Sequence, residues 1–169
     1  MGQDHRAITL TLDAFWQFSV SHYQKPGVEA ACLTLQDHYQ GNVNLALFLI
    51  YLEQQQYQTN GLLLNKLLAC LHAISHTTDD FRRLRRQLKP RLNHADYQAL
   101  LDFELSLEKQ QQATLIQQWE THVADNIVQP TSSVQPASLQ PKASQAQGLA
   151  LYCAQLGAPH LEQALHGQG

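Results

Sequence analysis

A cluster of basic residues is the feature of this sequence best suited to binding a charged partner. Six of the eleven Lys and Arg residues in the chain fall between positions 82 and 91. Four of them share one face of a helix: Arg82, Arg85, Arg86 and Lys89. Apolar side chains lie about a third of a turn away: Phe81, Leu84 and Leu88. We therefore expect the apolar side to pack against the protein and the basic side to face outward.

Guanidinium groups match the geometry of phosphates and carboxylates, so the basic face predicts a contact patch for a protein or another acidic or phosphate-bearing partner. Nucleic acid has weaker support as the partner, because no aromatic residues alternate with the arginines. The alternative is a solvated face whose charges pair with the acidic residues of the protein itself.

A second group combines aromatic and polar side chains near the N-terminus. In a helix, Trp16, Ser19, His22 and Tyr23 gather on one arc, and Gln36 lies on the inner face of the next helix. Buried polar groups need hydrogen-bond partners, so these residues either bond to one another or line a pocket between the first two helices. A nucleophile–base pair of Ser19 and His22 would also need an oxyanion site and an orienting group, and neither is recognisable. We predict no catalytic residue.

Two further pairs have spacings that chemistry can use. Glu104 and Glu108, four residues apart, suit acid–base chemistry or an ion pair with a neighbouring arginine. His72 and His76 have the spacing of metal ligands, but no third ligand is adjacent to them in the sequence. The sequence also contains no Gly-rich phosphate loop and no dinucleotide fingerprint. It therefore predicts no metal site and no cofactor.

The periodicity of apolar residues places all these side chains on helices. Leu is abundant while Val and Ile are scarce, which favours helix over strand. Turn and capping signals predict a helix that Thr11 or Asp13 caps and that runs to about 23, followed by helices at about 28–39, 43–56, 62–75, 77–89 and 94–123. The third helix is apolar on nearly all sides, which predicts a place at the centre of a bundle. The last has a potential break at residues 110–112.

The composition changes at residue 125. Residues 125–147 are rich in Pro, Ser and Gln and are expected to form a flexible linker. Residues 148–169 contain a short amphipathic segment that either binds a groove in a partner or folds back onto the bundle. The predicted fold is thus an all-α protein: a single bundle of about six helices at 1–124, followed by a flexible tail with one short helix.

Composition also narrows the functional classes. The net charge of −3 is too small to favour nucleic acid or a membrane surface in general. The longest apolar run, residues 45–52, is far shorter than the roughly 20 residues of a membrane span. Three widely separated cysteines do not form a disulfide framework and resemble small buried apolar residues. We expect a protein of the reducing cytoplasm.

One stretch is similar to a known family. The residues that carry the similarity are Trp16-Gln17-Phe18-Ser19, Tyr23, Pro26-Gly27-Val28, Ala31-Cys32-Leu33, Leu35-Gln36-Asp37 and Val43-Asn44. They resemble a proteobacterial family of small conserved proteins catalogued as a domain of unknown function, and the similarity covers the first third of the chain. The family has Gly where this chain has Gln40 and a carboxylate where it has Asn42, so a role of that carboxylate would not carry over to this amide. The resemblance implies a fold and a lineage but no mechanism.

Two functions follow as expectations. The first is a non-enzymatic interaction or adaptor module that uses the basic helix face. The second is a small-ligand-binding protein, or an enzyme, with a pocket between the first two helices.

Overall fold

The computed structural model describes residues 10–127 and 148–167, and every regular element within these ranges is helical. The prediction of an all-α protein is confirmed. In chain order the elements are α1 (Leu12–Tyr23), α2 (Val28–Tyr39), α3 (Val43–Gln54), α4 (Gly61–Leu88), the 3₁₀ turn η1 (Lys89–Arg91), α5 (His94–Ile127), α6 (Gly148–Gln155), the 3₁₀ turn η2 (Pro159–Leu161) and α7 (Glu162–Leu165).

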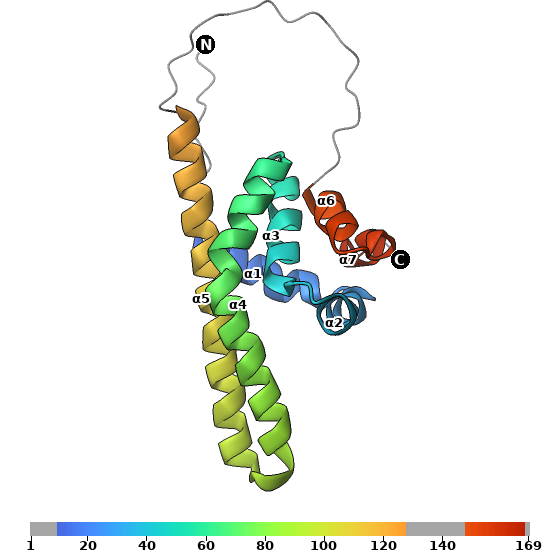
Figure 1. The fold of residues 1–169 in the computed structure, drawn as a ribbon, viewed down its shortest axis with the longest axis vertical. Coiled ribbons are helices and arrows are strands. Elements are labelled where there is room, and N and C mark those ends of the chain that lie inside the picture. The colour runs from blue at the N-terminus through green and yellow to red at the C-terminus, as the bar shows by residue number, and fades with distance from the viewer. Residues whose placement is uncertain (1–9, 128–147, 168–169) are drawn as a thin grey trace, which may run out of the picture.

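Helix α3 lies at the centre of the molecule, as its sequence predicted. All nine residues from Asn44 to Leu52 are buried. The Asn42 side chain caps α3 by accepting a hydrogen bond of 2.9 Å from the backbone N–H of Leu45. Helices α1, α5 and α6 pack around it (Figure 1). Because a helix without a polar face is stable only inside a bundle, α3 determines where its neighbours lie.

The two longest helices, α4 and α5, form an antiparallel hairpin (Figure 1). Helix α4 ends two residues before Pro90, which has no N–H to continue it. Asn93 begins α5 by accepting a hydrogen bond of 2.9 Å from the backbone N–H of Asp96. The end of the hairpin that holds η1 extends beyond the other helices.

The predicted boundary between the fourth and fifth helices is wrong, because α4 runs unbroken through it. The hydroxyl of Thr77 donates to the carbonyl of Ala73 at 3.2 Å, and that of Thr78 donates to the carbonyl of Ile74 at 2.8 Å. These threonines therefore bond back to the preceding turn instead of capping a new helix. The bundle consists of five α-helices, α1 to α5, where the sequence predicted about six.

The potential break in the last predicted helix is also absent, since α5 is continuous through residues 110–112. Gln111 and Gln112 are each 1% exposed. Their amide groups hydrogen-bond other helices in the interior, so these polar residues do not mark a helix end. Helix α5 also continues to Ile127 and so includes the first three residues of the linker predicted to start at 125. Residues 128–147 of that linker lie outside the described residues.

The C-terminal segment folds back onto the bundle, with α6 beside α3 and α7 beside α2 (Figure 1). The Tyr152 hydroxyl accepts a hydrogen bond of 2.7 Å from the backbone N–H of Asn42. Glu53 of α3 accepts from the backbone N–H of Leu149 at 3.0 Å and pairs with His166 at 2.8 Å. The sequence left open whether this segment binds a partner's groove or folds back onto the bundle. In the structure it packs on its own bundle.

A buried histidine joins α1 to the end of α7. Nε2–H of His22 donates to the carbonyl of Leu165 at 2.7 Å, and the side chain is 1% exposed. Burial, the largest effect, lowers the pKa of His22. The hydrogen bond to Leu165 opposes this effect, and the nearby charges of Lys25 and His166 lower the pKa further. The folded protein thus holds His22 in its neutral form.

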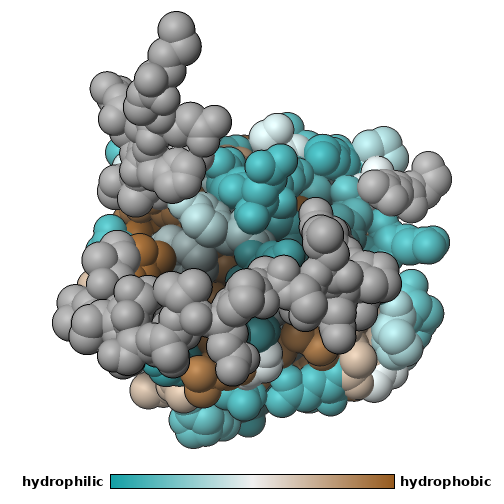
Figure 2. Space-filling view, turned by 90° about the horizontal axis from the view of Figure 1, so that it is seen from above, coloured by the Kyte–Doolittle hydropathy of each residue, from teal (hydrophilic) through white to brown (hydrophobic). Residues whose placement is uncertain are grey.

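The face seen from above in Figure 2 mixes hydrophilic and hydrophobic residues. None of the helices in the two described ranges combines the length and the apolar character needed to cross a bilayer.

The contact between Tyr152 and Asn42 can be tested by a single-atom change. Tyr152→Phe leaves the N–H of Asn42 without its acceptor and should lower the free energy of unfolding by about 1–2 kcal/mol in urea denaturation. Tyr39→Phe is the matched control, because the Tyr39 hydroxyl contacts His160 in an exposed pair at 3.3 Å. Equal effects of the two substitutions would contradict the importance given to the buried contact.

The pKa of His22 predicts a specific pH dependence. Its folded pKa lies below the unfolded value, so the unfolded chain binds more protons once the pH falls below about 6.5, and the folded state then loses stability. His166, whose pKa is raised first by its hydrogen bond to Glu53, acts in the opposite direction but contributes to wild type and His22→Gln alike. When the pH falls from about 8 to about 5, the wild type should therefore lose more of its free energy of unfolding than His22→Gln loses. A difference that stays constant over this range would refute the assignment.

Candidate functional site

A cavity of about 370 Å³ lies where α1, α2 and α3 meet the α4–α5 hairpin. We call it the aromatic cavity, after Trp16 and Tyr23 in its wall. Its lining residues are Trp16, Ser19, Val20, Tyr23, Gln24, Cys32, Leu33, Gln36, Val43, Asn44, Leu47, Arg82, Leu105, Glu108 and Gln112.

Four of the five predicted pocket residues line this cavity: Trp16, Ser19, Tyr23 and Gln36. Trp16, Ser19 and Tyr23 are three and four residues apart, so they share one face of α1, and Gln36 approaches from α2. The fifth, His22, does not line the cavity, because its imidazole bonds to Leu165. The sequence placed the pocket between the first two helices, whereas α3, α4 and α5 also contribute to its wall.

Exposed apolar side chains gather at the opening of the aromatic cavity. Val20 is 43% exposed, Leu33 44% and Leu105 42%, and each comes from a different helix. Only three other large hydrophobic residues in the described ranges are as open to solvent: Leu62, Leu84 and Phe103. Half of this exposed apolar set therefore surrounds one opening.

A buried amide forms the inner polar part of the wall. Nε2 of Gln112 donates to the Ser19 hydroxyl at 3.1 Å and to Oδ1 of Asn44 at 2.9 Å. The Ser19 hydroxyl in turn donates to the carbonyl of Phe15 at 2.9 Å. These bonds connect α5 to α1 and α3 directly beside the cavity.

The other end of the same amide has no hydrogen bond among the described residues. Oε1 of Gln112 is fully buried and has no partner. Leaving a buried acceptor unsatisfied costs about 1–3 kcal/mol, so this oxygen lowers the stability of the helix packing around it.

Arg82 forms the charged part of the wall, and each of its guanidinium nitrogens donates to a carboxylate. Nε bonds Glu104 at 3.0 Å, Nη1 bonds Asp79 at 3.1 Å and Nη2 bonds Glu108 at 2.9 Å. Arg85 shares Glu104 and also donates to the Tyr97 hydroxyl. Burial opposes the charge of Arg82, but the hydrogen bonds to Glu108 and Glu104 outweigh it and raise its pKa.

The expectation that the whole basic face points outward is wrong for two of its four residues. The side chains of Arg82 and Arg85 are 14% and 13% exposed, because α5 offers them Glu104 and Glu108. Arg86 and Lys89 remain exposed, with Arg86 near Asp37 and Lys89 over the Tyr97 ring. For Arg82 and Arg85 the structure has the alternative arrangement, in which a basic residue pairs with acids of the same chain.

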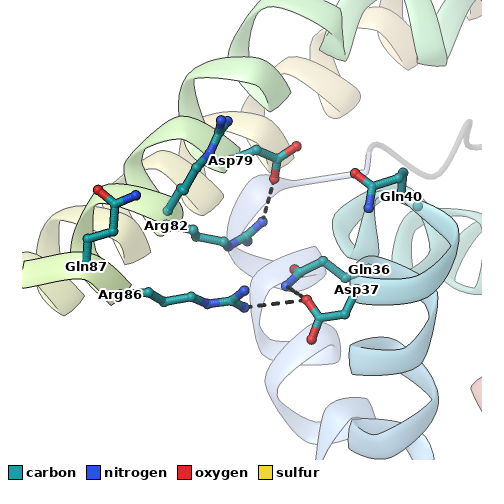
Figure 3. Close-up of a pocket in the computed structure, with 9 residues that line it drawn as sticks. Gln36, Asp37, Gln40, Asp79, Arg82, Arg86 and Gln87 are labelled. Atoms are coloured by element: carbon teal, nitrogen blue, oxygen red, sulfur yellow. Dashed lines mark hydrogen bonds and ion pairs between the residues drawn. The ribbon is translucent and has the colours of Figure 1, made fainter. Parts of the chain in front are cut away.

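A second, more polar hollow of about 900 Å³ opens between α2 and α4 and is shown in Figure 3. We call it the polar cleft. Arg86 of α4 faces Asp37 of α2 across it at 3.5 Å, a distance too long for a strong ion pair. Gln36 and Arg82 line both hollows, so the polar cleft and the aromatic cavity meet at these two side chains.

The nucleophilic groups near the aromatic cavity are held in unreactive states. Burial, with the charge of Glu29, raises the pKa of the Cys32 thiol to about 12, so the sulfur is protonated at neutral pH. Ser19 bonds to Phe15 and Gln112, and His22 bonds to Leu165, so the two do not form a nucleophile–base pair. What the arrangement offers is shape, apolar surface and hydrogen-bonding groups.

Sequence reasoning did not assign Asn44, Arg82, Glu108 or Gln112 to this cavity. A signal was present, because Glu104, Glu108 and Gln112 follow at intervals of four residues on one face of a long helix. Within the two described ranges, no three His, Cys, Asp or Glu side chains cluster as metal ligands would.

A known protein family matches most of the helical bundle. The family model described as "Protein of unknown function (DUF2390)" matches residues 14–115, which include most of α1, all of α2 to α4, much of α5 and every residue that lines the aromatic cavity. A search of curated proteins finds no match to this chain. A search of solved structures finds none either. The matched residues make up more than half of the sequence, so the chain belongs to the DUF2390 family.

Proposed function

We propose that this protein binds a small organic ligand in the aromatic cavity. The observation that carries the proposal is the concentration of exposed apolar side chains at the opening, where Val20, Leu33 and Leu105 stand in solvent. Exposed apolar groups that gather at one opening, instead of lying scattered, are typical of a binding surface.

The volume and the lining agree with such a role. Pockets for small molecules usually measure about 300–1,000 Å³ and combine an apolar wall with a few placed polar groups. Here aromatic and aliphatic side chains from α1, α2, α3 and α5 form the wall, and Ser19, Asn44 and Gln112 form its polar inner part. The hydrogen bonds among these three residues hold the polar groups in position before a ligand arrives.

A matched pair of leucines tests the proposal. Compounds that raise the melting temperature of the wild type are first selected from a library of small organic molecules, and their affinities are measured by calorimetry. Leu33→Ser should weaken binding about fivefold, because it removes about 1 kcal/mol of apolar contact at the opening. Leu62→Ser should leave affinity unchanged, since Leu62 is 63% exposed and lies outside the cavity.

Two outcomes would contradict the proposal. One is a library in which no compound raises the melting temperature. The other is an equal loss of affinity in both variants, which would place the ligand elsewhere.

An interaction or adaptor module is the second candidate, and the polar cleft favours it. Arg83 and Arg86 are 68% and 57% exposed, and their partners Asp80 and Asp37 are themselves open to solvent. Such exposed ion pairs contribute little to stability, so both guanidinium groups are free to exchange their partners for an acidic or phosphate-bearing surface.

This second candidate predicts a defined salt dependence. A partner captured by crosslinking from native cells at low salt should lose affinity for the Arg83→Glu, Arg86→Glu double variant but not for Arg91→Glu. If both arginines contact phosphates, log affinity should fall against log salt with a slope of about −2 for wild type, measured by titration at several ionic strengths. A flat salt dependence, or a partner retained by the double variant, would reject the module.

A further inference from the structure

The charged donor in the wall of the aromatic cavity, Arg82, and the amide donors of Gln112 and Asn44 are already engaged by the protein. Nε2 of Gln112 donates to Ser19 and Asn44, and Nδ2 of Asn44 donates to Gln111. All three nitrogens of Arg82 donate to carboxylates. An anionic ligand would have to compete with Glu104, Glu108 and Asp79 for this guanidinium.

One charged acceptor, by contrast, remains unused. Oε1 of Glu108 accepts from Arg82, and no donor among the described residues reaches the second carboxylate oxygen. Because the guanidinium of Arg82 is occupied and this carboxylate oxygen is open, the charged part of the wall favours a ligand that donates a hydrogen bond and carries a positive charge.

The aromatic wall suits the same charge. The negative faces of Trp and Tyr rings attract cations within about 6 Å of the ring centre. Trp16 already has one such contact, since Nζ of Lys109 lies 4.8 Å from its ring centroid. Lys109 is not among the residues that line the aromatic cavity. Tyr23 remains a neutral phenol at physiological pH, because burial, with the nearby acidic groups of Cys32, Glu29 and Glu108, raises its pKa to about 12.

From these observations we infer that the ligand of the aromatic cavity is an organic amine: an apolar body that packs between Trp16, Tyr23 and the aliphatic opening, with an ammonium group directed at Glu108. This inference rests on the proposed ligand-binding function and adds the chemical class of the ligand to it.

Matched probes test the class directly. Tryptamine, tryptophol and indole-3-propionate share one apolar body and differ in the charge of the end group, as do octylamine, octanol and octanoate. Each is titrated into the full-length, ¹⁵N-labelled wild-type protein, and affinities are obtained from amide chemical shifts. The amine of each set should bind at least about tenfold more tightly than the carboxylate, as expected for a charge-assisted hydrogen bond.

A charge-removing substitution then locates the contact. Glu108→Gln keeps an oxygen that can accept from Arg82 but removes the negative charge, so it should weaken amine binding about tenfold and leave alcohol binding unchanged. Glu120→Gln is the control, because it makes the same change at an exposed position of α5 outside the cavity and should alter neither. The selectivity of the wild type decides the matter even if Glu108→Gln fails to fold.

The outcomes separate this inference from the function on which it rests. If none of the six probes shifts residues of the aromatic cavity at millimolar concentration, the proposed ligand-binding function fails with it. If the carboxylates or alcohols bind there as tightly as the amines, the cavity is a ligand site but the ligand is not an amine. Equal weakening by Glu108→Gln and Glu120→Gln would likewise overturn the assignment to Glu108.

Discussion

The rest of this structure depends on the hydrogen bonds of two consecutive buried glutamines on α5, Gln111 and Gln112. Gln111 accepts hydrogen bonds from Asn42 at 2.7 Å and Asn44 at 3.3 Å and donates to Thr78 at 2.8 Å. Gln112 donates to Ser19 and Asn44. Neighbouring residues on a helix point about 100° apart, so the pair reaches α3 and α4 with one side chain and α1 and α3 with the other. A buried network of this kind is stable only if its members meet, and it therefore fixes how the four helices pack.

The same network links the bundle to its C-terminal segment. Asn42 caps α3 with its side chain, donates to Gln111 and to the Ser75 hydroxyl at 2.9 Å, and offers its backbone N–H to Tyr152. One residue thus connects α3, α4, α5 and α6. The resemblance to the family suggested a carboxylate at this position in relatives, and here the amide supplies donors that a carboxylate lacks.

The location of the aromatic cavity follows from these constraints. Gln112 holds α1 and α3 against α5, and the ion pairs of Arg82 hold α4 against α5. The side chains between these two sets of contacts are aromatic on α1 and aliphatic on α2, and they leave a hollow that they do not fill. The groups that stabilise the helix packing therefore also form the polar wall of the cavity, which explains why the donors of Arg82 and Gln112 are occupied.

The sequence by itself determined the helical class, the boundaries of the first three helices to within about two residues, and the central place of α3, because periodicity, capping residues and Gly or Pro breaks are local signals. It also brought Trp16, Ser19 and Tyr23 onto one face of α1, since their spacing along a helix is sufficient for that.

The sequence failed to predict the continuous helix at Thr77 and at Gln110 to Gln112, where polar residues resemble the residues that end helices. A polar side chain can end a helix, face water or bond another helix, and partners distant in the sequence decide which. Gln112 bonds Ser19 and Arg82 bonds Glu104, and both partners lie on other helices. Only the tertiary structure decided that Arg82 and Arg85 turn inward, that α6 and α7 return to the bundle, and that a cavity remains between five helices, because each of these depends on which surfaces meet in space.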